Sequence, residues 1–516
     1  MTLRSLRPLR LNAFMTLKTN ILLITSDQQH WTTLGVLNPE IHTPNLDRLA
    51  AQGTLFERAY CPNPTCSPTR ASIITGLYPS QHGCYSLGTK LSEKVPTVGE
   101  MLQTAVYRTA LVGKAHFQPL RSTDQYPSLE SYPIMQDLDF WRGFHGPFYG
   151  FDHVELARNH VDEAHVGQHY ALWMEEQGCH NWRDYFQPPT GNNPNQRWHW
   201  EIPEEFHYNK WIADRSNALM SDFQAAGEPF FLWASFFDPH PPYLAPAPWD
   251  TMYDPDMLTL AQLVPGEHDK NPPHFAMTQQ QNPDFSAWHE PHGHHMHGLR
   301  SHLWEQETLA KDTAVYYGMV SLMDKYIGQI LDKLDALGLT DSTLVVFTSD
   351  HGHLFGQHGM TAKGAFHYED LVKVPFIVRW PGKVTAGARS HAMQSLVDLA
   401  PTFLAAAGLD IPIEMTGLNQ AGCWQTGTAV RDHIIVENRH QPTTVHLKTY
   451  VNDRYKLTVY YNQPYGELFD LHADPQEVNN LWDTPEAAGL KADLMMKLLH
   501  AEMGKEVLSM PRIIHA

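Results

Sequence analysis

Residues 20–30 read NILLITSDQQH, and this stretch decides which fold the rest of the chain can form. It begins with a short aliphatic run, NILLIT, which is typical of a buried parallel strand. Asp27 and Gln28 follow this run closely. Because open α/β sheets place their binding sites at the carboxyl ends of parallel strands, the stretch predicts a strand that delivers polar side chains to a site. An ordinary strand end with a solvated aspartate is the alternative.

A second stretch repeats this pattern far along the chain. Residues 343–348, TLVVFT, form a β-branched run that ends in Ser349, Asp350 and His351, and they predict another buried strand. Between residues 313 and 337 apolar side chains recur at helical spacing, which predicts a long amphipathic helix. Together these elements predict an α/β fold with a large mixed, mostly parallel sheet flanked by helices. Shorter strands are expected at 109–112, 229–237 and 374–378.

The chain is expected to divide into three parts. Residues 1–19 are expected to be a poorly ordered leader, and residues 20–412 the main α/β domain. Residues 413–516 change to short segments with two-residue alternation, which predicts a smaller C-terminal subdomain built on an antiparallel sheet.

Two insertions interrupt the main domain, near residues 121–200 and 244–303. The first is rich in aromatic residues and prolines, so we expect it to cover the sheet edge and wall a pocket, or to act as a structural cap. The second contains a histidine-rich run that could bind a metal or form a flexible or substrate-facing loop. No cysteine or paired carboxylate accompanies these histidines, which favours the loop. They are His289, His292, His294, His295 and His297.

Composition excludes several classes of protein. The 516 residues include 56 acids and 37 lysines and arginines, giving a net charge of −19, which argues against general nucleic-acid binding. Five cysteines are too few for a disulfide framework, and their odd number leaves a free thiol, as in a reducing compartment. No apolar run approaches the roughly 20 residues that cross a bilayer. No convincing signal peptide is found either, so we expect a cytoplasmic protein with no membrane partner.

Residues 61–83, CPNPTCSPTRASIITGLYPSQHG, place one cysteine in an unusual setting. Pro62 and Pro64 disfavour a helix upstream, whereas the segment from Ala71 onward can form one. Cys66 is therefore expected at or just before a helix N-terminus, where backbone amides and the helix dipole favour an anion. Both a reactive thiolate and a buried structural cysteine fit this position.

The two strand ends offer a candidate metal site. Carboxylate and amide oxygens suit Ca²⁺ or Mg²⁺ better than zinc, although the histidine makes the choice less clean. A cation beside Cys66, Arg70 and Lys114 would create a positive hole that fits a sulfate or phosphate ester. The candidate ligands are Asp27, Gln28, Asp350 and His351.

Six groups of residues resemble the motifs of one family, in the order in which that family has them. They are SDQQ at 26–29, CSPTR at 66–70 followed by TGLYP, GKAHF at 113–117, DPHPPY at 238–243, TSDHG at 348–352 followed by HGMTAKG, and ELFDLHADPQEVNNL at 467–481. The family is that of the type I, formylglycine-dependent sulfatases of the alkaline phosphatase superfamily. The resemblance implies an alkaline-phosphatase-like fold, with residues 20–412 as the sulfatase catalytic domain.

The resemblance also implies a nucleophile and a metal. Cys66 would be oxidised to formylglycine by the formylglycine-generating enzyme during maturation, and the hydrated aldehyde would attack the substrate. The metal would be Ca²⁺, with Mg²⁺ or Mn²⁺ as alternatives. Its implied ligands are Asp27, Gln28, Asp350, His351 and the modified Cys66.

The remaining motif residues receive roles from the same resemblance. Arg70 would steady the formylglycine hydroxyl, and Lys114 and His116 would bind the sulfate and the second hydroxyl. His116 would also be the base that breaks down the covalent intermediate. His240 and Lys363 would face the leaving-group oxygen. The implied function is hydrolysis of an aryl or carbohydrate sulfate monoester, in two displacement steps, with release of inorganic sulfate.

Two departures from the family pattern keep a second function open. Gln28 stands where the family often has an acid, and His351 where it often has asparagine. Both substitutions resemble phosphonate monoester and phosphodiester hydrolases that share the formylglycine, whereas the residues GKAH resemble sulfatases. A third reading is a catalytically silent anion- or glycan-binding protein in which Cys66 stays a thiol. The sequence indicates no oligomeric state.

Overall fold

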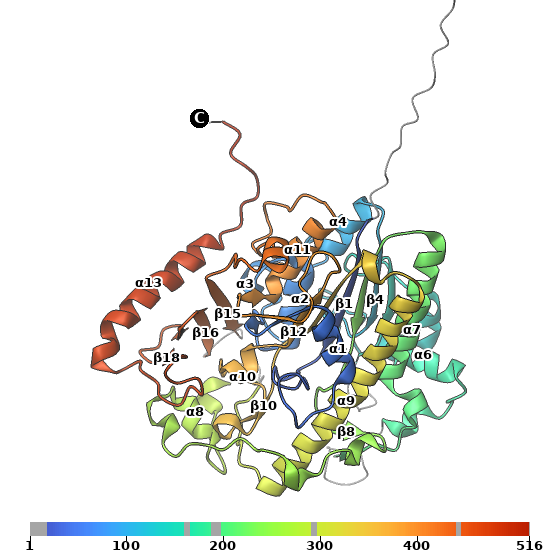
Figure 1. The fold of residues 1–516 in the computed structure, drawn as a ribbon. Coiled ribbons are helices and arrows are strands. Elements are labelled where there is room, and N and C mark those ends of the chain that lie inside the picture. Colours follow the sequence, from blue (N-terminus) through green and yellow to red (C-terminus); the bar gives the residue numbers. More distant parts are fainter. Residues whose placement is uncertain (1–17, 159–165, 187–197, 290–296, 440–444, 515–516) are drawn as a thin grey trace, which may run out of the picture.

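The computed structural model describes residues 18–158, 166–186, 198–289, 297–439 and 445–514. Its centre is an eight-stranded mixed sheet with the strand order β13-β2-β12-β9-β1-β7-β4-β5 (Figure 1). This sheet confirms the predicted α/β fold. Its strands are β1 (Asn20–Ser26), β2 (Thr54–Phe56), β4 (Arg108–Gly113), β5 (His153–Leu156), β7 (Phe230–Ser235), β9 (Thr343–Ser349), β12 (Phe376–Arg379) and β13 (Ala388–Ser390).

The register of the central strands brings their carboxyl ends to one level. Strand β1 runs parallel to both β7 and β9, with Thr25 opposite Ser235 and Ser26 opposite Ser349. The segments that follow these strands therefore meet at the same edge of the sheet, as expected for parallel neighbours. Strand β12 instead pairs antiparallel with β9, which makes the sheet mixed.

Helices cover both faces of the sheet (Figure 1). Ile21 and Leu23 of β1 pack into one apolar cluster, with side chains of α2, α4 and α11. Leu22 and Ile24 pack into the other, with side chains of α1, α7 and α9. Alternate residues of a single strand thus serve two cores, which is why the strand is apolar throughout. These helices are α1 (Pro44–Gln52), α2 (Cys66–Thr75), α4 (Val98–Thr104), α7 (Tyr208–Ala226), α9 (Gln306–Ala336) and α11 (Leu399–Ala406).

Helix α9 begins earlier than the sequence predicts. It spans 31 residues from Gln306, whereas the periodic pattern is visible only from residue 313. Its first turns carry polar side chains such as Glu307 and Lys311, which form an ion pair on the surface and show no apolar periodicity. The predicted long helix packed on the sheet is otherwise confirmed, because its apolar side chains share a cluster with those of β1 and β9.

The C-terminal part forms the predicted smaller antiparallel sheet, in the order β15-β16-β17-β18. Helix α13 (Ala488–Gly504) packs on it through Leu494 and Leu498, which share an apolar cluster with Ile435 and Leu457. Figure 1 shows α13 beside these strands and on the far side of the molecule from α7 and α9. The strands are β15 (His433–Arg439), β16 (His446–Asn452), β17 (Tyr455–Tyr460) and β18 (Gly466–Asp470).

The insertion near residues 121–200 does more than cover the sheet edge. It supplies the edge strand β5, which pairs parallel with β4, and the helices α5 (Leu138–Gly143) and α6 (Gln168–Glu176). The sequence does not predict β5, because its residues, HVEL, include two polar side chains and form no apolar run. Residues 1–17 of the expected leader and most of the histidine-rich run, residues 290–296, lie outside the described residues.

Several short elements complete the described chain. Strands β10 and β11 form a two-residue antiparallel pair that leads into Lys363. The short elements are β3 (Ala59–Tyr60), β6 (Trp198–His199), β8 (Leu244–Ala245), β10 (Leu354–Phe355), β11 (Thr361–Ala362), β14 (Gln394–Ser395), α3 (Pro79–His82), α8 (Pro273–Thr278), α10 (Glu369–Val372) and α12 (Ala421–Thr426).

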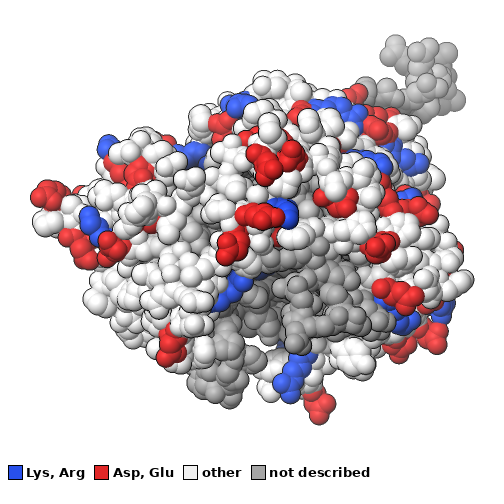
Figure 2. All heavy atoms as spheres, turned by 90° about the horizontal axis from the view of Figure 1, so that it is seen from below, with Lys and Arg blue, Asp and Glu red and all other residues white. Residues whose placement is uncertain are grey.

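Figure 2 shows the molecule from below, with acidic and basic side chains interspersed over the described part of that face. No broad basic patch is visible among those side chains, which agrees with the acidic composition. Among the described residues, no helix has the length and apolar character that a bilayer span requires.

Candidate active site

Residues from distant parts of the sequence converge at the carboxyl edge of the sheet. Asp27 follows β1, Asp350 and His351 follow β9, and Cys66 begins α2. One ligand atom from each of these four residues lies within 4.8 Å of the others, and all four side chains are buried. The structure therefore brings together four of the five residues that the sequence predicts as metal ligands.

Local structure explains the position of Cys66. It is the first residue of α2, after Thr65 in an extended conformation, as predicted from the prolines upstream. The Asn63 side chain accepts a hydrogen bond from the Thr65 backbone at 2.9 Å, and the Thr69 hydroxyl donates to the Asn63 carbonyl at 2.6 Å. These bonds fix the turn that leads into the helix. Every residue of α2 is buried, so Cys66 lies inside the protein and not on its surface.

The sulfur of Cys66 lies among charged and polar groups. Its Sγ is 3.3 Å from Nε2 of His351, 3.2 Å from Nζ of Lys363 and 3.6 Å from Oδ1 of Asp27. Burial, together with the charge of Asp27, raises the pKa of the Cys66 thiol. The charges of Lys114 and Lys363 oppose this rise.

Arg70 and Asp350 form a buried ion pair one turn into α2. The Nε of Arg70 donates to Oδ2 of Asp350 at 2.8 Å, and Nη1 donates to the Lys114 carbonyl and the Ser235 hydroxyl. Burial alone would lower the pKa of Arg70, but the carboxylates of Asp350 and Asp27, with smaller contributions, together outweigh burial and raise this pKa. Arg70 thus joins three strand ends, those of β4, β7 and β9. Its Nη2 is buried without a hydrogen-bond partner in the described part of the chain.

Asp27 is held in its ionised form. Its carboxylate contacts the ammonium group of Lys114. Burial by itself would raise the pKa of Asp27, but the charges of Lys114 and Arg70 outweigh burial and hold the pKa well below its usual range. Asp27 therefore offers a charged carboxylate oxygen, the type of ligand that hard divalent cations prefer.

Gln28 is oriented by a chain of hydrogen bonds. Its amide Nε2 lies 2.7 Å from Nδ1 of His353, whose Nε2 lies 2.9 Å from the Tyr243 hydroxyl. The amide nitrogen can only donate, so Nδ1 of His353 accepts. The other end of the amide, Oε1, is buried and has no hydrogen-bond partner among the described residues. A buried amide oxygen without a partner, on the residue that follows Asp27 and whose backbone N–H donates to Asp350, fits a metal ligand.

His351 is present in the tautomer that a metal ligand needs. Its Nδ1 donates to the Gly352 carbonyl at 2.9 Å, which leaves a lone pair on Nε2, the atom that faces Cys66. Burial lowers the pKa of His351 to about 4, so the ring is neutral at pH 7. The donor set as a whole, with carboxylate and amide oxygens and one imidazole, fits a hard divalent cation.

His240 and Lys363 form a second pair at the site. Nδ1 of His240 is 2.5 Å from the Pro241 carbonyl, so Nδ1 carries the hydrogen and donates it. Nε2 of His240 can then accept from the Lys363 ammonium, which lies 3.1 Å away. Lys363 also lies 3.4 Å from Nε2 of His351, so it links the pair to the candidate metal ligands.

Lys114 and His116 follow strand β4 directly. The backbone N–H of His116 donates to Oε1 of Glu130 at 2.7 Å, which anchors the loop. Nε2 of His116 lies 2.8 Å from a guanidinium nitrogen of Arg158. All the residues that the sequence predicts as catalytic or metal-ligating therefore lie in this region, Gln28 included. The others are Asp27, Cys66, Arg70, Lys114, His116, Asp350, His351, Lys363 and His240, which contacts Lys363.

Several residues that contact this site are not predicted from the sequence. Glu130 and Arg158 come from the first insertion and belong to no motif, so only the folded chain reveals them. Ser235 lies at the end of β7, where it binds Arg70. Of these four residues, His353 is the one that the sequence could have indicated, because it follows His351 by two residues in the segment DHGH.

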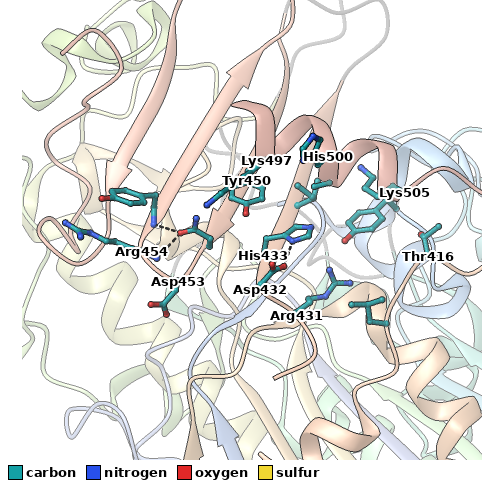
Figure 3. Close-up of a pocket in the computed structure, with 17 residues that line it drawn as sticks. Thr416, Arg431, Asp432, His433, Tyr450, Asp453, Arg454, Lys497, His500 and Lys505 are labelled. Carbon is teal, nitrogen blue, oxygen red and sulfur yellow. Dashed lines mark hydrogen bonds and ion pairs between the residues drawn. The ribbon is translucent and has the colours of Figure 1, made fainter. Parts of the chain in front are cut away.

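Two cavities lie outside this cluster. A cavity of about 670 Å³ lies beside the contact between the C-terminal sheet and α13, and Figure 3 shows His433 and Tyr450 of the sheet among its lining residues, with Lys497, His500 and Lys505 of the α13 region. It contains none of the predicted site residues. A second cavity of about 690 Å³ is walled by the first insertion, including Ile134, Phe144 and Phe148, as predicted for that segment.

Comparison with known proteins agrees with the sequence motifs. The family model described as Sulfatase matches residues 19–409, and the model described as N-sulphoglucosamine sulphohydrolase, C-terminal, matches residues 356–504. An arylsulfatase from Clostridium perfringens is 28% identical over 502 residues, which cover 95% of each chain.

The chain is also similar in sequence to a sulfatase named for a sugar substrate, and similar in fold to a known crystal structure. An N-acetylglucosamine-6-O-sulfatase from Bacteroides thetaiotaomicron is 26% identical over 487 residues, covering 89% of this chain and 81% of that protein. The crystal structure of the phosphonate monoester hydrolase of Agrobacterium radiobacter superposes with a TM-score of 0.79 at 23% identity, covering 96% of this chain and 98% of that one. At that identity the superposition shows a shared fold.

Proposed function

The chain belongs to the sulfatase family and is a sulfatase, and on this premise we propose that it cleaves sulfate monoesters through a formylglycine made from Cys66. The observation that carries the proposal is the burial of Cys66 Sγ between His351, at 3.3 Å, and Lys363, at 3.2 Å, beside two carboxylates. The motif CSPTR supports a modified side chain at this position, and His351 and Lys363 are placed to contact it.

Maturation would require a separate enzyme. Cys66 is only 1% exposed, so a formylglycine-generating enzyme would reach it before the chain has folded around it. The motif CSPTR supports this partner, because Pro68 and Arg70 follow the cysteine at the spacing of the family pattern. The other cysteines, Cys61, Cys84, Cys179 and Cys423, lack this context.

The metal would be a hard divalent cation, with Ca²⁺ our first choice. Its proposed ligands are Asp27, Gln28, Asp350, His351 and the modified side chain at position 66. When bound, such a cation polarises the nucleophile and the ester oxygens and stabilises developing negative charge.

The protein side chains would divide the remaining tasks. Arg70 would hold Asp350 and steady the nucleophile, and Lys114 and His116 would bind oxygens of the sulfate. The Lys363–His240 pair would face the leaving alcohol, where it can deliver a proton. The product alcohol and inorganic sulfate would then leave the site.

The proposed class of substrate is inferred mainly from the proteins to which this chain is similar. The relative named N-acetylglucosamine-6-O-sulfatase and the C-terminal match to a sulphohydrolase model support a carbohydrate sulfate, with an aryl sulfate as the convenient assay substrate. Hydrolysis of phosphonate monoesters or phosphodiesters is the second candidate. It is supported by Gln28 and His351 and by the fold shared with a phosphonate monoester hydrolase.

Kinetics and mass spectrometry test the proposal. The enzyme purified from a host that makes formylglycine should show a far higher kcat/KM on an aryl sulfate than on the phenyl monoester of a phosphonic acid, and the reverse order would replace our first candidate by the second. Mass spectrometry of the peptide that contains Cys66 should show the aldehyde. A peptide with the intact thiol from such a host would instead favour a non-catalytic anion- or glycan-binding protein.

A further inference from the structure

Arg158 lies beside the active site although no motif contains it. It follows strand β5 in the first insertion, and it is only 5% exposed. Its Nη2 is 2.8 Å from Nε2 of His116, and its Nη1 donates to the Gln118 carbonyl at 3.0 Å. Arg158 also forms an ion pair with Glu130, at 3.5 Å, which compensates the positive charge of its guanidinium.

This contact determines which nitrogen of His116 carries the proton. A guanidinium has only donors and stays protonated in proteins, so Nε2 of His116 must accept from Arg158. The neutral ring then carries its hydrogen on Nδ1. That Nδ1 is buried and has no hydrogen-bond partner among the described residues. It is therefore a donor without an acceptor, which is costly unless a ligand supplies one.

Glu130 fixes the geometry of the whole unit. Its Oε1 accepts from the His116 backbone and its Oε2 from the Gln118 backbone, both at 2.7 Å. The loop is thereby held with His116 in the left-handed region, at φ 59°. Carboxylate, guanidinium and imidazole thus form one connected group in which each member restricts the next.

The surrounding charges oppose a second proton on the ring. Burial and the charge of Arg158 hold the pKa of His116 well below its usual value, and Lys114 and Arg70 act in the same direction. An imidazolium here would lie among three cations. The ring is therefore neutral in the free enzyme, and its lone pair is occupied by Arg158.

We propose that Arg158 is a positioning residue that holds His116 as the Nδ1-protonated tautomer, so that His116 donates a hydrogen bond to an oxygen of the substrate sulfate. The inference rests on the proposed function and refines it. In the free enzyme the lone pair on Nε2 accepts from Arg158, so the ring meets the sulfate with its Nδ1–H.

Neutron diffraction from crystals of the full, deuterium-exchanged chain tests the tautomer without any assay. Deuterium on Nδ1 of His116, and none on Nε2, is the expected result. Deuterium on Nε2, or on both nitrogens, would overturn the proposal. This measurement stands apart from the proposed function: an enzyme that hydrolyses no aryl sulfate would refute the function, while the neutron map would still decide the tautomer.

Variants of His116 test which nitrogen matters in turnover. The amide nitrogen of asparagine can replace Nδ1–H, whereas that of glutamine reaches nearer to the position of Nε2. With an aryl sulfate, H116Q should lose about 100- to 1,000-fold in kcat, as for loss of one donor to a developing oxyanion, and H116N should lose less. Equal losses, or the greater loss in H116N, would contradict a donor at Nδ1.

Variants of Arg158 test its positioning role. Arg158→Gln should lower kcat about 10- to 100-fold, because glutamine can also accept and so no longer fixes the ring. Arg158→Lys keeps a cationic donor and should recover most of the loss. If Arg158 were merely structural, both variants would lose activity equally and both would melt earlier. Arg142→Gln is the matched control, since Arg142 is an exposed arginine of the same insertion, and its kcat should stay unchanged.

Discussion

The Lys363–His240 pair yields a prediction that depends on the leaving group. In the structure Nδ1 of His240 donates to a carbonyl and Nε2 faces the Lys363 ammonium at 3.1 Å, so the two residues share one transferable proton. Removing either residue should therefore abolish proton delivery to the departing oxygen. An alkyl sulfate needs that proton because an alkoxide leaves poorly, whereas 4-nitrophenolate leaves without it.

The size of the effect follows from the value of a positioned acid. General acid catalysis typically contributes about 10²- to 10⁴-fold, which corresponds to about 2.7–5.4 kcal/mol of barrier. H240A should lose about this much in kcat/KM on hexyl sulfate, but roughly tenfold or less on 4-nitrophenyl sulfate. Because one proton is shared, H240A combined with K363A should lose little more than either variant alone.

The assay is initial-rate sulfate release from both esters by the wild type, both single variants and the double variant. Lys311→Ala serves as the control, because this exposed lysine forms its ion pair with Glu307 on the surface of α9. Equal losses on the two esters would remove the pair from the leaving-group role. If the loss of kcat/KM in the double variant equalled the product of the two single losses, the two residues would act independently. That result would contradict a shared proton.

Three further predictions concern the nucleophile, the metal and a distant ion pair. Cys66→Ala should show no turnover, while its melting temperature stays near that of the wild type. Cys84→Ala is the control and should remain active. Sulfate release by Cys66→Ala would refute Cys66 as the source of the nucleophile. Dialysis against a chelator should lower both the activity and the melting temperature. Ca²⁺ added at about 100 times its Kd should restore about 2.7 kcal/mol of unfolding free energy. If chelation changed neither the activity nor the melting temperature, the metal site would be contradicted. Burial alone would raise the pKa of Glu437, but Lys505 and Lys448 lower it from 4.5 to about 2, so its contribution to stability is present above pH 4.5 and is lost as the pH falls to about 2. The difference in unfolding free energy between wild type and Glu437→Gln, measured in urea, should shrink over that range, and a constant difference would contradict this reasoning.

The part of the site that sequence predicts is the part set by local pattern. Asp27 and Asp350 each follow a buried apolar run, and parallel strands must bring such ends to one edge, so the pattern of the chain alone predicts that they meet. Cys66 is predictable in the same way, because prolines before it and helix formers after it place it at a helix start.

The parts that escape prediction depend on contacts distant in the sequence. Arg158 reaches His116 only because β5 adds to the sheet edge beside β4, and the residues HVEL contain no apolar run that would predict this strand. Glu130 is likewise one acid among many until the loop folds and two backbone N–H groups point at its carboxylate. Long-range packing of irregular segments has no periodic signature, which is why these residues carry no sequence signal.

Fold alone cannot decide between the two candidate substrates. The chain is similar in sequence to an arylsulfatase and similar in fold to a phosphonate monoester hydrolase, so one backbone serves both chemistries. Net charge cannot decide either, because a sulfate monoester and a phosphonate monoester each carry one negative charge at neutral pH. They differ in shape: the phosphonate has a carbon substituent where the sulfate has a further oxygen. A fixed donor aimed at that oxygen would lose its acceptor with a phosphonate, and an unpaired buried donor is a strong basis for discrimination. The Nδ1–H of His116, held by Arg158, is such a donor. Substrate preference should therefore respond more to changes at Arg158 than to Gln28→Asp, which alters the charge felt by both esters alike.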